Sequence, residues 1–242
     1  MKLICLETSA KTASAAIVTE GKVLGLTQIT AGLTHSQTVL PALSSLLSGC
    51  SMSIADADGF AVSIGPGSFT GLRIGISAVK GMAQGSGKKC IGVSTLEALA
   101  YNFSGLSYTI CPVMDARCGQ VYTSLFWANG GAPKRLWEDM AIPIETLREK
   151  LSSVEGDVML VGDGAELAFA ALSADRSVLI APPALRFQSA ASVGMAALHH
   201  LETEELSDPG SLMPAYLRLP QAERELLARE AMVKAAAREA AK

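Results

Sequence analysis

Two acidic residues stand where catalytic carboxylates are often found, at the ends of apolar, strand-like runs. Glu7 follows the run at residues 3–6, and Asp115 follows the run at residues 108–114 in the second half of the chain. Carboxylates that face each other across a cleft can hold the magnesium of a nucleotide or act as a general base. Carboxylates in ordinary surface turns do neither, and the positions of Glu7 and Asp115 leave both interpretations open.

A glycine-rich turn is the second candidate for binding chemistry. The segment Gly65-Pro66-Gly67-Ser68 lies between a strand-like run and a helix-like run. Free N–H groups at the start of a helix can hold an anion or allow another chain to approach closely. A tight turn that needs positive φ explains the same residues equally well. The segment is not a dinucleotide-binding loop, because Thr70 stands where the third glycine is required, and no Walker pattern occurs.

The patterns of metal sites and activated nucleophiles are missing from the sequence. Among the three histidines, His35, His199 and His200, no pair has i,i+4 spacing, and adjacent helical residues point about 100° apart. The cysteines form no CxxC pair, and no G-x-S-x-G elbow occurs. We therefore expect no metal site formed by this chain alone and no nucleophilic triad.

The helix-like run after the turn is unusually rich in glycine. The glycines in or beside it are Gly71, Gly75, Gly81 and Gly85. Ser77, Gly81 and Gly85 follow one another at i,i+4 spacing and form a stripe of small residues. Each glycine inside a helix costs about 1 kcal/mol relative to alanine, so such a helix needs close packing on its small-residue face. Either the chain's own sheet or another helix, from this chain or a partner, lies across that face.

The expected elements repeat in the two halves of the chain. Residues 1–104 read as three strands, a helix, a strand, a helix, a strand and a helix. From residue 105 to about 220 the pattern starts again with two strands and a tight turn, followed by helices between strands. We therefore predict a duplicated α/β fold with two lobes, 1–104 and 105–220. Residues 221–242 are rich in Ala, Glu, Arg and Lys and form a tail that we expect to be helical when supported.

Two helices of the first half carry local signals. Thr34 and Gln37 have the spacing of a capping box, and the helix that follows ends at Gly49. Pro41 removes one hydrogen bond inside it, so we expect a kink or a later start. The second helix is predicted over residues 72–84.

The composition indicates a folded chain that stays in the cytosol. The 242 residues are 49% hydrophobic and 18% charged, which excludes a disordered chain, and the net charge of −3 gives no basic surplus for independent binding of nucleic acid. The five cysteines favour free thiols, with a Cys111–Cys118 pair across a hairpin as the alternative. No apolar start resembles a signal peptide, and no uncharged apolar run approaches about 18 residues. We expect a cytoplasmic protein without membrane contact.

Five separate motifs resemble those of the TsaB (YeaZ) family of bacterial proteins for the biosynthesis of threonylcarbamoyladenosine in tRNA. The most specific is the eleven-residue run Gly65-Pro66-Gly67-Ser68-Phe69-Thr70-Gly71-Leu72-Arg73-Ile74-Gly75. The others are Leu6-Glu7-Thr8-Ser9, His35-Ser36-Gln37 with Leu40-Pro41, Asp115-Ala116-Arg117 and Pro214-Ala215-Tyr216-Leu217-Arg218. They span nearly the whole chain to Arg218, and the tail lies outside the resemblance.

The resemblance implies a fold and a role. The fold is the duplicated actin/Hsp70/sugar-kinase (ASKHA) fold, two lobes each with a mixed sheet flanked by helices. The role is that of a non-catalytic subunit, which binds a TsaD-like catalytic subunit and acts with a TsaE-like ATPase in threonylcarbamoyl transfer to adenosine 37 of tRNA. The resemblance therefore implies that the chain has no catalytic residue and no intrinsic cofactor, and that ATP or ADP binds at the partner interface. It also implies that the chain contacts tRNA only through the complex and forms a homodimer when it is alone.

The resemblance also assigns residues. The partner interface is implied on two helices, at His35, Gln37, Leu40, Leu43, Leu47, Gly71, Arg73, Gly75 and Gly81. Nucleotide or phosphate loops are implied at Glu7, Thr8, Ser9, Asp115, Gly162 and Gly164. Glu7 stands where nucleotide-hydrolysing relatives carry aspartate, which argues against ATP hydrolysis by this chain alone. The alternatives are a nucleotide hydrolase or M22-type peptidase homologue, and a structural homodimer that uses the helix surface for itself.

Overall fold

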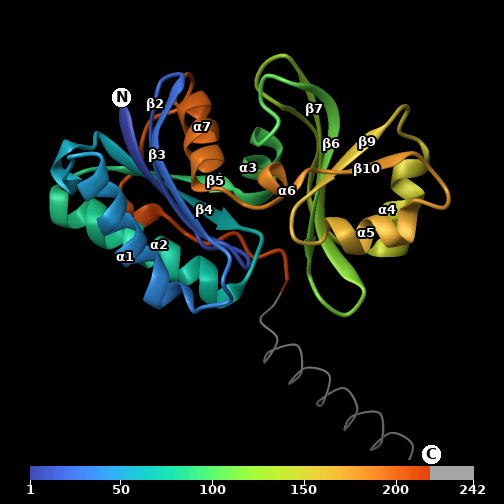
Figure 1. The fold of residues 1–242 in the computed structure, drawn as a ribbon, viewed down its shortest axis with the longest axis horizontal. Helices are drawn as coiled ribbons and strands as arrows, with labels where there is room; N and C mark the ends of the chain where they lie inside the picture. The colour runs from blue at the N-terminus through green and yellow to red at the C-terminus, as the bar shows by residue number, and fades with distance from the viewer. Residues whose placement is uncertain (219–242) are drawn as a thin grey trace, which may run out of the picture.

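Two five-stranded mixed sheets organise the part of the chain that this computed structural model describes, residues 1–218 (Figure 1). The first sheet has the order β3-β2-β1-β4-β5, and the second has the order β10-β9-β6-β7-β8. The first contains β1 (Lys2–Glu7), β2 (Ala13–Thr19), β3 (Lys22–Ile29), β4 (Gly59–Gly65) and β5 (Cys90–Ser94). The second contains β6 (Ser107–Asp115), β7 (Gln120–Asn129), β8 (Lys134–Pro143), β9 (Val158–Val161) and β10 (Val178–Ile180).

The two sheets have the same topology when the second is read from its other edge. In each, three consecutive strands pair antiparallel, and the next two strands add in parallel on the other side of the first. β1 and β6 therefore occupy equivalent central positions, which brings Glu7 and Asp115 to equivalent strand ends. This repetition confirms the predicted duplicated α/β fold with two mixed sheets flanked by helices.

Helices cover both faces of the first sheet. α1 (His35–Gly49) and α2 (Phe69–Ser86) pack on one face, where Ile4, Ile17 and Leu72 are fully buried. α7 (Ala190–His200) packs on the other face against Cys5 and Val18. α7 follows the second sheet in sequence, yet it lies on the first lobe (Figure 1). α7 and the described residues after it as far as Ala215 therefore lie against the first lobe, although their sequence positions fall in the predicted range 105–220.

Two helices of the second lobe cover the face of its sheet that is turned away from the first lobe (Figure 1). α4 (Ile144–Ser152) and α5 (Ala165–Leu172) pack on the outer face of its sheet, and α6 (Pro183–Arg186) follows β10. α3 (Thr95–Tyr101) lies between the lobes (Figure 1), where it packs against both sheets. Two short 3-10 helices, η1 (Ile54–Asp56) and η2 (Pro209–Ser211), complete the described elements.

Several local predictions differ from the structure. Thr34 does not cap α1 with its side chain; its carbonyl accepts the amide of Gln37 instead. α1 begins at His35 and includes Pro41. α2 begins at Phe69, three residues earlier than predicted, because the Ser68 side chain accepts the amide of Gly71 and so caps the extra turn. The strands β8 and β10 were not among the predicted elements.

The described residues settle two further points of the sequence analysis. All five cysteines are free, so Cys111 and Cys118 do not pair, and the Cys111 thiol lies instead 3.3 Å from the Thr123 hydroxyl. Within residues 1–218, no helix is both long enough and apolar enough to cross a membrane. The predicted tail, 221–242, lies outside the described residues.

Candidate functional site

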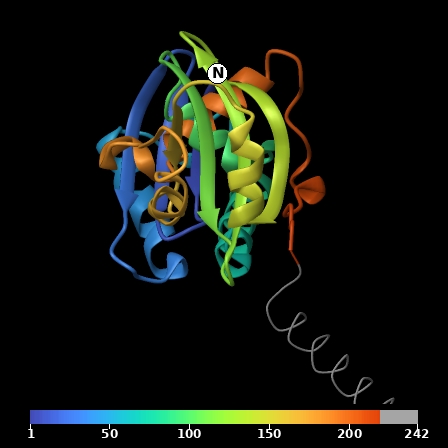
Figure 2. The same cartoon turned by 90° about the vertical axis from the view of Figure 1, so that its right-hand side faces the viewer.

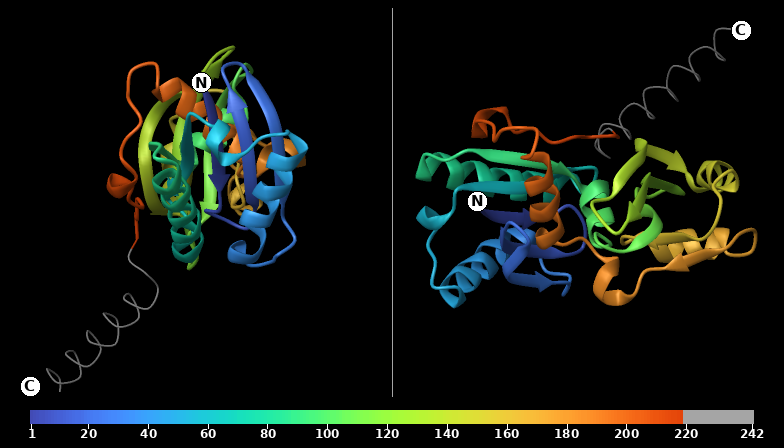
Figure 3. Two further views of the ribbon diagram at one scale, coloured as in Figure 1. Left: turned by 90° about the vertical axis from the view of Figure 1, so that its left-hand side faces the viewer. Right: turned by 90° about the horizontal axis from the view of Figure 1, so that it is seen from above.

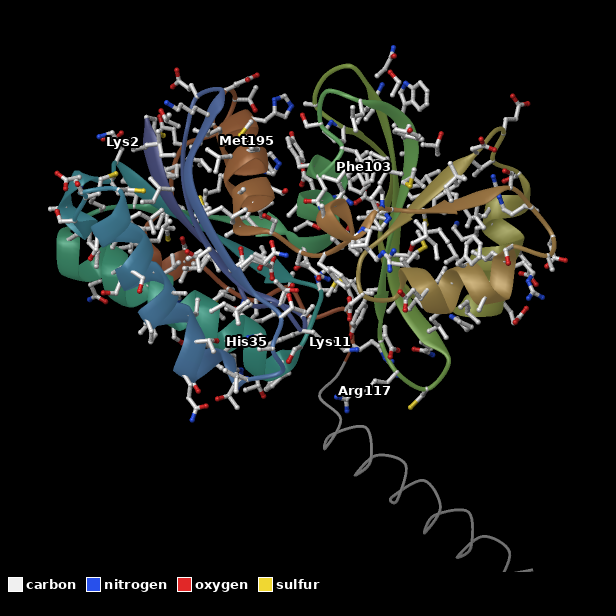
Figure 4. All side chains as sticks on the ribbon, in the orientation of Figure 1. Lys2, Lys11, His35, Phe103, Arg117 and Met195 are labelled. Carbon is white, nitrogen blue, oxygen red and sulfur yellow. The ribbon has the colours of Figure 1, made fainter. Side chains whose placement is uncertain are left out.

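A cleft between the two lobes is the first candidate site. It encloses a cavity of about 610 Å³. Figure 4 shows Lys11 and Arg117 at this end of the molecule, on opposite lobes. The cavity is lined by residues 9–11 and 67–70 of the first lobe, residues 114–117, Tyr122 and Asp163 of the second, and residues 216–218 near the end of the described chain.

Glu7, the first acidic candidate, does not reach this cavity. Its side chain is fully buried, and its Oε1 accepts the backbone amide of Ser9, while Oε2 has no hydrogen-bond partner among the described residues. Burial raises the pKa of the Glu7 carboxyl, and the Ser9 amide, the nearby Ser9 and Ser63 hydroxyls and His35 oppose that shift. A carboxylate enclosed in this way cannot hold a metal ion in the cleft.

Thr8 and the backbone of Ser9 are likewise held by contacts within the chain, whereas Ser9 Oγ has no hydrogen-bond partner among the described residues and Ser9 lines the cavity. The Thr8 hydroxyl donates to the carbonyl of Gly71 in α2 at 2.8 Å. The Ser9 carbonyl accepts the amide of Ser68 at 2.6 Å, so the glycine-rich turn closes down on the end of β1. Both side chains are fully buried. The loop that the resemblance assigns to phosphate therefore serves to anchor α2.

The second lobe contributes acidic groups to the cavity. Asp115 lines it, and its Oδ1 accepts the amide of Arg117 at 2.7 Å. Asp163 lines it too, and burial raises the pKa of its carboxyl, against a hydrogen bond from Gln188 at 3.0 Å. The sequence analysis missed Asp163, although the two glycines that flank it at the end of a strand were a signal of a tight turn there.

Gly162 and Gly164 have a structural reason to be glycine. Gly162 has φ +110°, and a Cβ on it would lie 2.2 Å from the carbonyl oxygen of Val113. A Cβ on Gly164 would lie 2.9 Å from the amide nitrogen of Asp115. Both glycines allow the turn after β9 to approach β6 closely, and neither lines the cavity.

A magnesium nucleotide, which the fold family implies in such a cleft, does not fit the residues present. The equivalent of the metal-holding aspartate is Glu7, whose carboxylate is enclosed, and the adjoining loop is closed against Ser68. Within residues 1–218 no three His, Cys, Asp or Glu side chains lie together as a metal site would need. Ser9, Asp115 and Asp163 line the cleft, but Glu7, the carboxylate at the end of β1, does not reach it.

The second candidate site is the solvent-exposed side of α1 and α2, which we call the two-helix face. It consists of Gln37, Leu40, Ser44, Ser77, Gly81 and Gly85, all exposed. Leu40 is 48% exposed, a high value for leucine on a helix that packs on a sheet. A Cβ on Gly81 or on Gly85 would meet no atom within 4 Å. The sheet beneath therefore does not explain these two glycines.

Charged groups are scarce on these helices. α1 contains no Asp, Glu, Lys or Arg, and α2 contains only Arg73 and Lys80. Lys80 donates to the carbonyl of Gly210, and Arg73 donates to the hydroxyl of Tyr216, so both turn toward the C-terminal segment. The six residues of the two-helix face are therefore uncharged, and the exposed Arg73 stands one turn before Ser77 on α2.

Five of the residues assigned to the partner interface have contacts inside the chain instead. Leu43 and Leu47 are buried in the core, and His35 holds the carbonyl of Ala10 through Nε2 at 2.6 Å. Gly71 and Gly75 are buried against Thr8. Of the three leucines assigned to the interface, Leu40, Leu43 and Leu47, only Leu40 is at the surface.

The comparisons with known proteins bear on these two sites. A family model described as TsaD, tRNA N6-adenosine threonylcarbamoyltransferase, matches residues 29–226. The TsaB protein of Bacillus subtilis, a tRNA threonylcarbamoyladenosine biosynthesis protein, is 31% identical over 92% of this chain and 96% of that protein. The chain belongs to the TsaB family. The TsaB protein of Escherichia coli is 30% identical over 68% of this chain and 72% of that protein.

A solved structure confirms the fold. YeaZ from Pseudomonas aeruginosa superposes with a TM-score of 0.76, at 24% identity, over 89% of this chain and 99% of that chain. The duplicated lobes are therefore of the ASKHA type, as the motifs predicted. Membership of the TsaB family places the chain among the proteins of threonylcarbamoyladenosine biosynthesis in tRNA.

Proposed function

We propose that this TsaB-family chain is a non-catalytic subunit, which docks through the two-helix face on a TsaD-like catalytic subunit and supports threonylcarbamoyl transfer to adenosine 37 of tRNA. The observations that carry the proposal are the open space at Gly81 and Gly85 on α2 and the exposure of Leu40 on α1. Glycine weakens a helix by about 1 kcal/mol per residue, and nothing in the described chain packs there to offset this. A helix of a partner lying across the stripe would use the space.

The cleft supports the non-catalytic part of the proposal. Glu7 is enclosed, and the loop after it anchors α2, so the first lobe brings no carboxylate from the end of β1 into the cleft. The carboxylates that line the cleft, Asp115 and Asp163, come from the second lobe alone. We propose that it has no catalytic residue and no intrinsic cofactor, and that ATP or ADP in the working complex lies at the partner interface. A TsaE-like ATPase acts with that complex, and the chain meets tRNA only through it.

Self-association is the second candidate use of the same face. A stripe of small residues beside one exposed leucine is complementary to a second copy of itself, because the ridge of one copy can enter the stripe of the other. In this proposal the homodimer forms only when the TsaD-like partner is absent. The two associations compete, since both cover Gly81.

Binding titrations against the TsaD-like protein of the same cell test the proposal. Gly81→Leu introduces four carbons where the partner must approach, and overpacking of about 1–3 kcal/mol corresponds to a loss of affinity of roughly 5- to 150-fold. The matched control is Gly131→Leu, since Gly131 lies in the second lobe and its Cβ would also meet no atom within 4 Å. Equal affinity of the two variants would contradict docking through the two-helix face.

A charge substitution gives an independent test of the same face. Leu40→Glu places a carboxylate in the proposed contact, whereas Leu136→Glu does so on β8 at a leucine of similar exposure, 50% against 48%. We expect Leu40→Glu alone to lose binding and to fail to restore threonylcarbamoyladenosine in tRNA of cells depleted of this chain. Normal restoration by Leu40→Glu would contradict the proposal.

A further inference from the structure

The described chain after α7 runs along the first lobe, and Figures 2 and 3 show it passing down one side of the molecule. Its last described residues, 216–218, line the cleft. Ser207 bridges to Cys90 at the edge strand β5, and Leu212 is buried in the core beneath α1 and α2. We call residues 212–218 the strap.

The strap is attached firmly to the first lobe. The Ala215 amide donates to the carbonyl of Ile64 in β4 at 2.8 Å. The Ala215 carbonyl lies so near Gly65 that a Cβ there would be 2.4 Å from it, and Gly65 has φ +128°. The glycine that begins the signature run is therefore required by the strap as well as by the turn.

An aromatic stack joins the strap to α2. The Tyr216 ring lies on the Phe69 ring, with centroids 4.7 Å apart and an angle of 24° between the planes. The Arg73 guanidinium carbon lies 3.9 Å from the Phe69 centroid, and Arg73 Nε donates to the Tyr216 hydroxyl at 3.0 Å. Arg73 is exposed and stands four residues before Ser77, so it begins the row that continues to Gly81.

The other end of the strap holds the second lobe. The Arg218 guanidinium donates through Nη1 to the carbonyl of Ala116, and at 3.3 Å to the carbonyl of Arg117. These carbonyls belong to the turn between β6 and β7, where Arg117 and Cys118 both have positive φ. A charged donor on two carbonyls fixes the position of this turn relative to the first lobe.

We propose that the strap holds the two lobes in one relative orientation, and that the Phe69–Arg73–Tyr216 stack couples it to docking at the two-helix face. The coupling rests on the proposed function, whereas the restraint on the lobes does not. A partner that covers α2 removes water from Arg73, and a cation–π contact is stronger when it is desolvated. By thermodynamic reciprocity, closing the strap then favours docking, by up to about tenfold in affinity.

The restraint is tested with spin labels on both lobes of the full chain, at the exposed positions Lys22 and Glu149, with Cys50 and Cys118 replaced by serine. Arg218→Ala removes the hold on the second lobe, so we expect a broader distribution of label distances. Arg176→Ala is the matched control, because Arg176 donates to the carbonyls of Leu151 and Gly156 within the second lobe alone. Identical distributions for the two variants would overturn the restraint.

A second pair of variants tests the stack. Tyr216→Ala removes the ring from Phe69 and the acceptor from Arg73, and we expect it to broaden the distances as Arg218→Ala does. The control is Tyr108→Ala, a tyrosine of similar exposure, 36% against 37%, which contacts Phe103 instead. If Tyr216→Ala leaves the distances as narrow as Tyr108→Ala does, the stack has no part in the restraint.

The coupling is tested by titration with the TsaD-like partner. Arg218 contacts the turn between β6 and β7, away from the two-helix face, yet coupling predicts that Arg218→Ala weakens binding several-fold while Arg176→Ala does not. Broadened distances with unchanged affinity would overturn the coupling and leave docking intact. If the unaltered chain does not bind the TsaD-like protein, the proposed function and the coupling of the strap to docking are both wrong. The distances between the spin labels then still test whether the strap restrains the two lobes.

Discussion

Thr8 and Gly71 are in reciprocal contact between the end of β1 and the first turn of α2. The Thr8 hydroxyl donates to the Gly71 carbonyl at 2.8 Å, and a Cβ on Gly71 would lie 2.1 Å from the Thr8 carbonyl oxygen. The glycine is therefore required for the approach of this helix to its own sheet. The same helix carries Gly81, whose surroundings are open, so two glycines of one signature-bearing helix have different roles.

The first prediction compares the same substitution at these two glycines. Gly71→Ala brings a methyl group against backbone that cannot move aside, so we expect a loss of about 1–3 kcal/mol, or roughly 2–12 °C in Tm for a chain of this size. Gly81→Ala gains helix propensity of up to about 1 kcal/mol and raises Tm by roughly 2–4 °C. Thermal unfolding by circular dichroism measures both. A drop in Tm for Gly81→Ala would show that this position is packed.

The fold was predictable because its signals are local and repeated. Apolar runs bounded by turns indicated eight of the strands, and helical spacing indicated the helices that carry the candidate sites. β10 has only three residues, and β8 begins with pairs of charged and apolar residues in turn, without strict alternation or a continuous apolar run, so neither gave a clear signal. The return of α7 to the first lobe is a long-range contact that no local pattern encodes.

The sequence predicted which elements form the candidate sites better than it predicted which residues of those elements face them. Motifs located α1, α2 and the strand ends correctly, but periodicity cannot tell which side of an amphipathic helix meets the sheet when both sides hold leucine or glycine. Leu43 and Leu47 are buried whereas Leu40 is exposed, and Gly75 is buried whereas Gly81 is exposed. The strap escaped prediction because its anchors, Phe69 and Arg218, lie about 150 residues apart in sequence.

The second prediction concerns the enclosed carboxyl of Glu7. Burial raises its pKa in the folded chain above the ordinary 4.5, so the folded state binds the proton more tightly than the unfolded state does. The contribution of Glu7 to the free energy of unfolding is therefore greatest below pH 4.5, and this contribution is lost as pH rises through the pKa of the folded chain. Each unit of raised pKa costs about 1.4 kcal/mol once the carboxyl is ionised.

Glu7→Gln removes this cost while keeping an acceptor for the Ser9 amide. We expect the variant to match or exceed the original chain in Tm at pH 7.5, with the difference shrinking as pH falls toward 4.5. Thermal unfolding at several pH values measures this. A variant that is less stable at pH 7.5, with a deficit that disappears as pH falls and the carboxyl of the original chain is protonated, would show that the negative charge itself holds the loop, through His35 or the Ser9 amide.

The third prediction is that the purified chain has negligible magnesium-dependent ATP hydrolysis. The carboxylate that would handle the metal is enclosed, and the adjoining loop is closed by the hydrogen bond from Ser68 to Ser9. Phosphate release from ATP, measured with and without magnesium, checks it. A turnover that Glu7→Ala abolishes would contradict this account of the cleft.

The last prediction uses two neighbouring histidines of α7 as a matched pair. His200 Nε2 lies 2.8 Å from Glu97 Oε1 in α3, and Arg135 of β8 lies 3.5 Å from the other oxygen of that carboxylate. The Glu97 hydrogen bond raises the pKa of His200 above 6.5, with burial opposing it. Burial by itself would raise the pKa of Glu97, but His200 and Arg135 together bring it below 4.5. His199 is exposed, its Nδ1 lies 3.4 Å from Glu202 Oε2, and its ring lies 6.3 Å from the Tyr101 ring.

The directions of these two pKa shifts define a pH range in which both groups stabilise the folded chain. The contribution of His200 is complete below pH 6.5 and is lost as pH rises through its folded pKa, whereas that of Glu97 is complete above pH 4.5 and is lost as pH falls through its own. The pair therefore stabilises the contact of α7 with α3 most between these values. We expect His200→Gln to cost about 1 kcal/mol at pH 6 and clearly less at pH 9, and His199→Gln to cost little at either pH. Urea unfolding of both variants at the two pH values measures the difference, and an equal cost for His200→Gln at pH 6 and pH 9 would mean that the ion pair contributes nothing to stability.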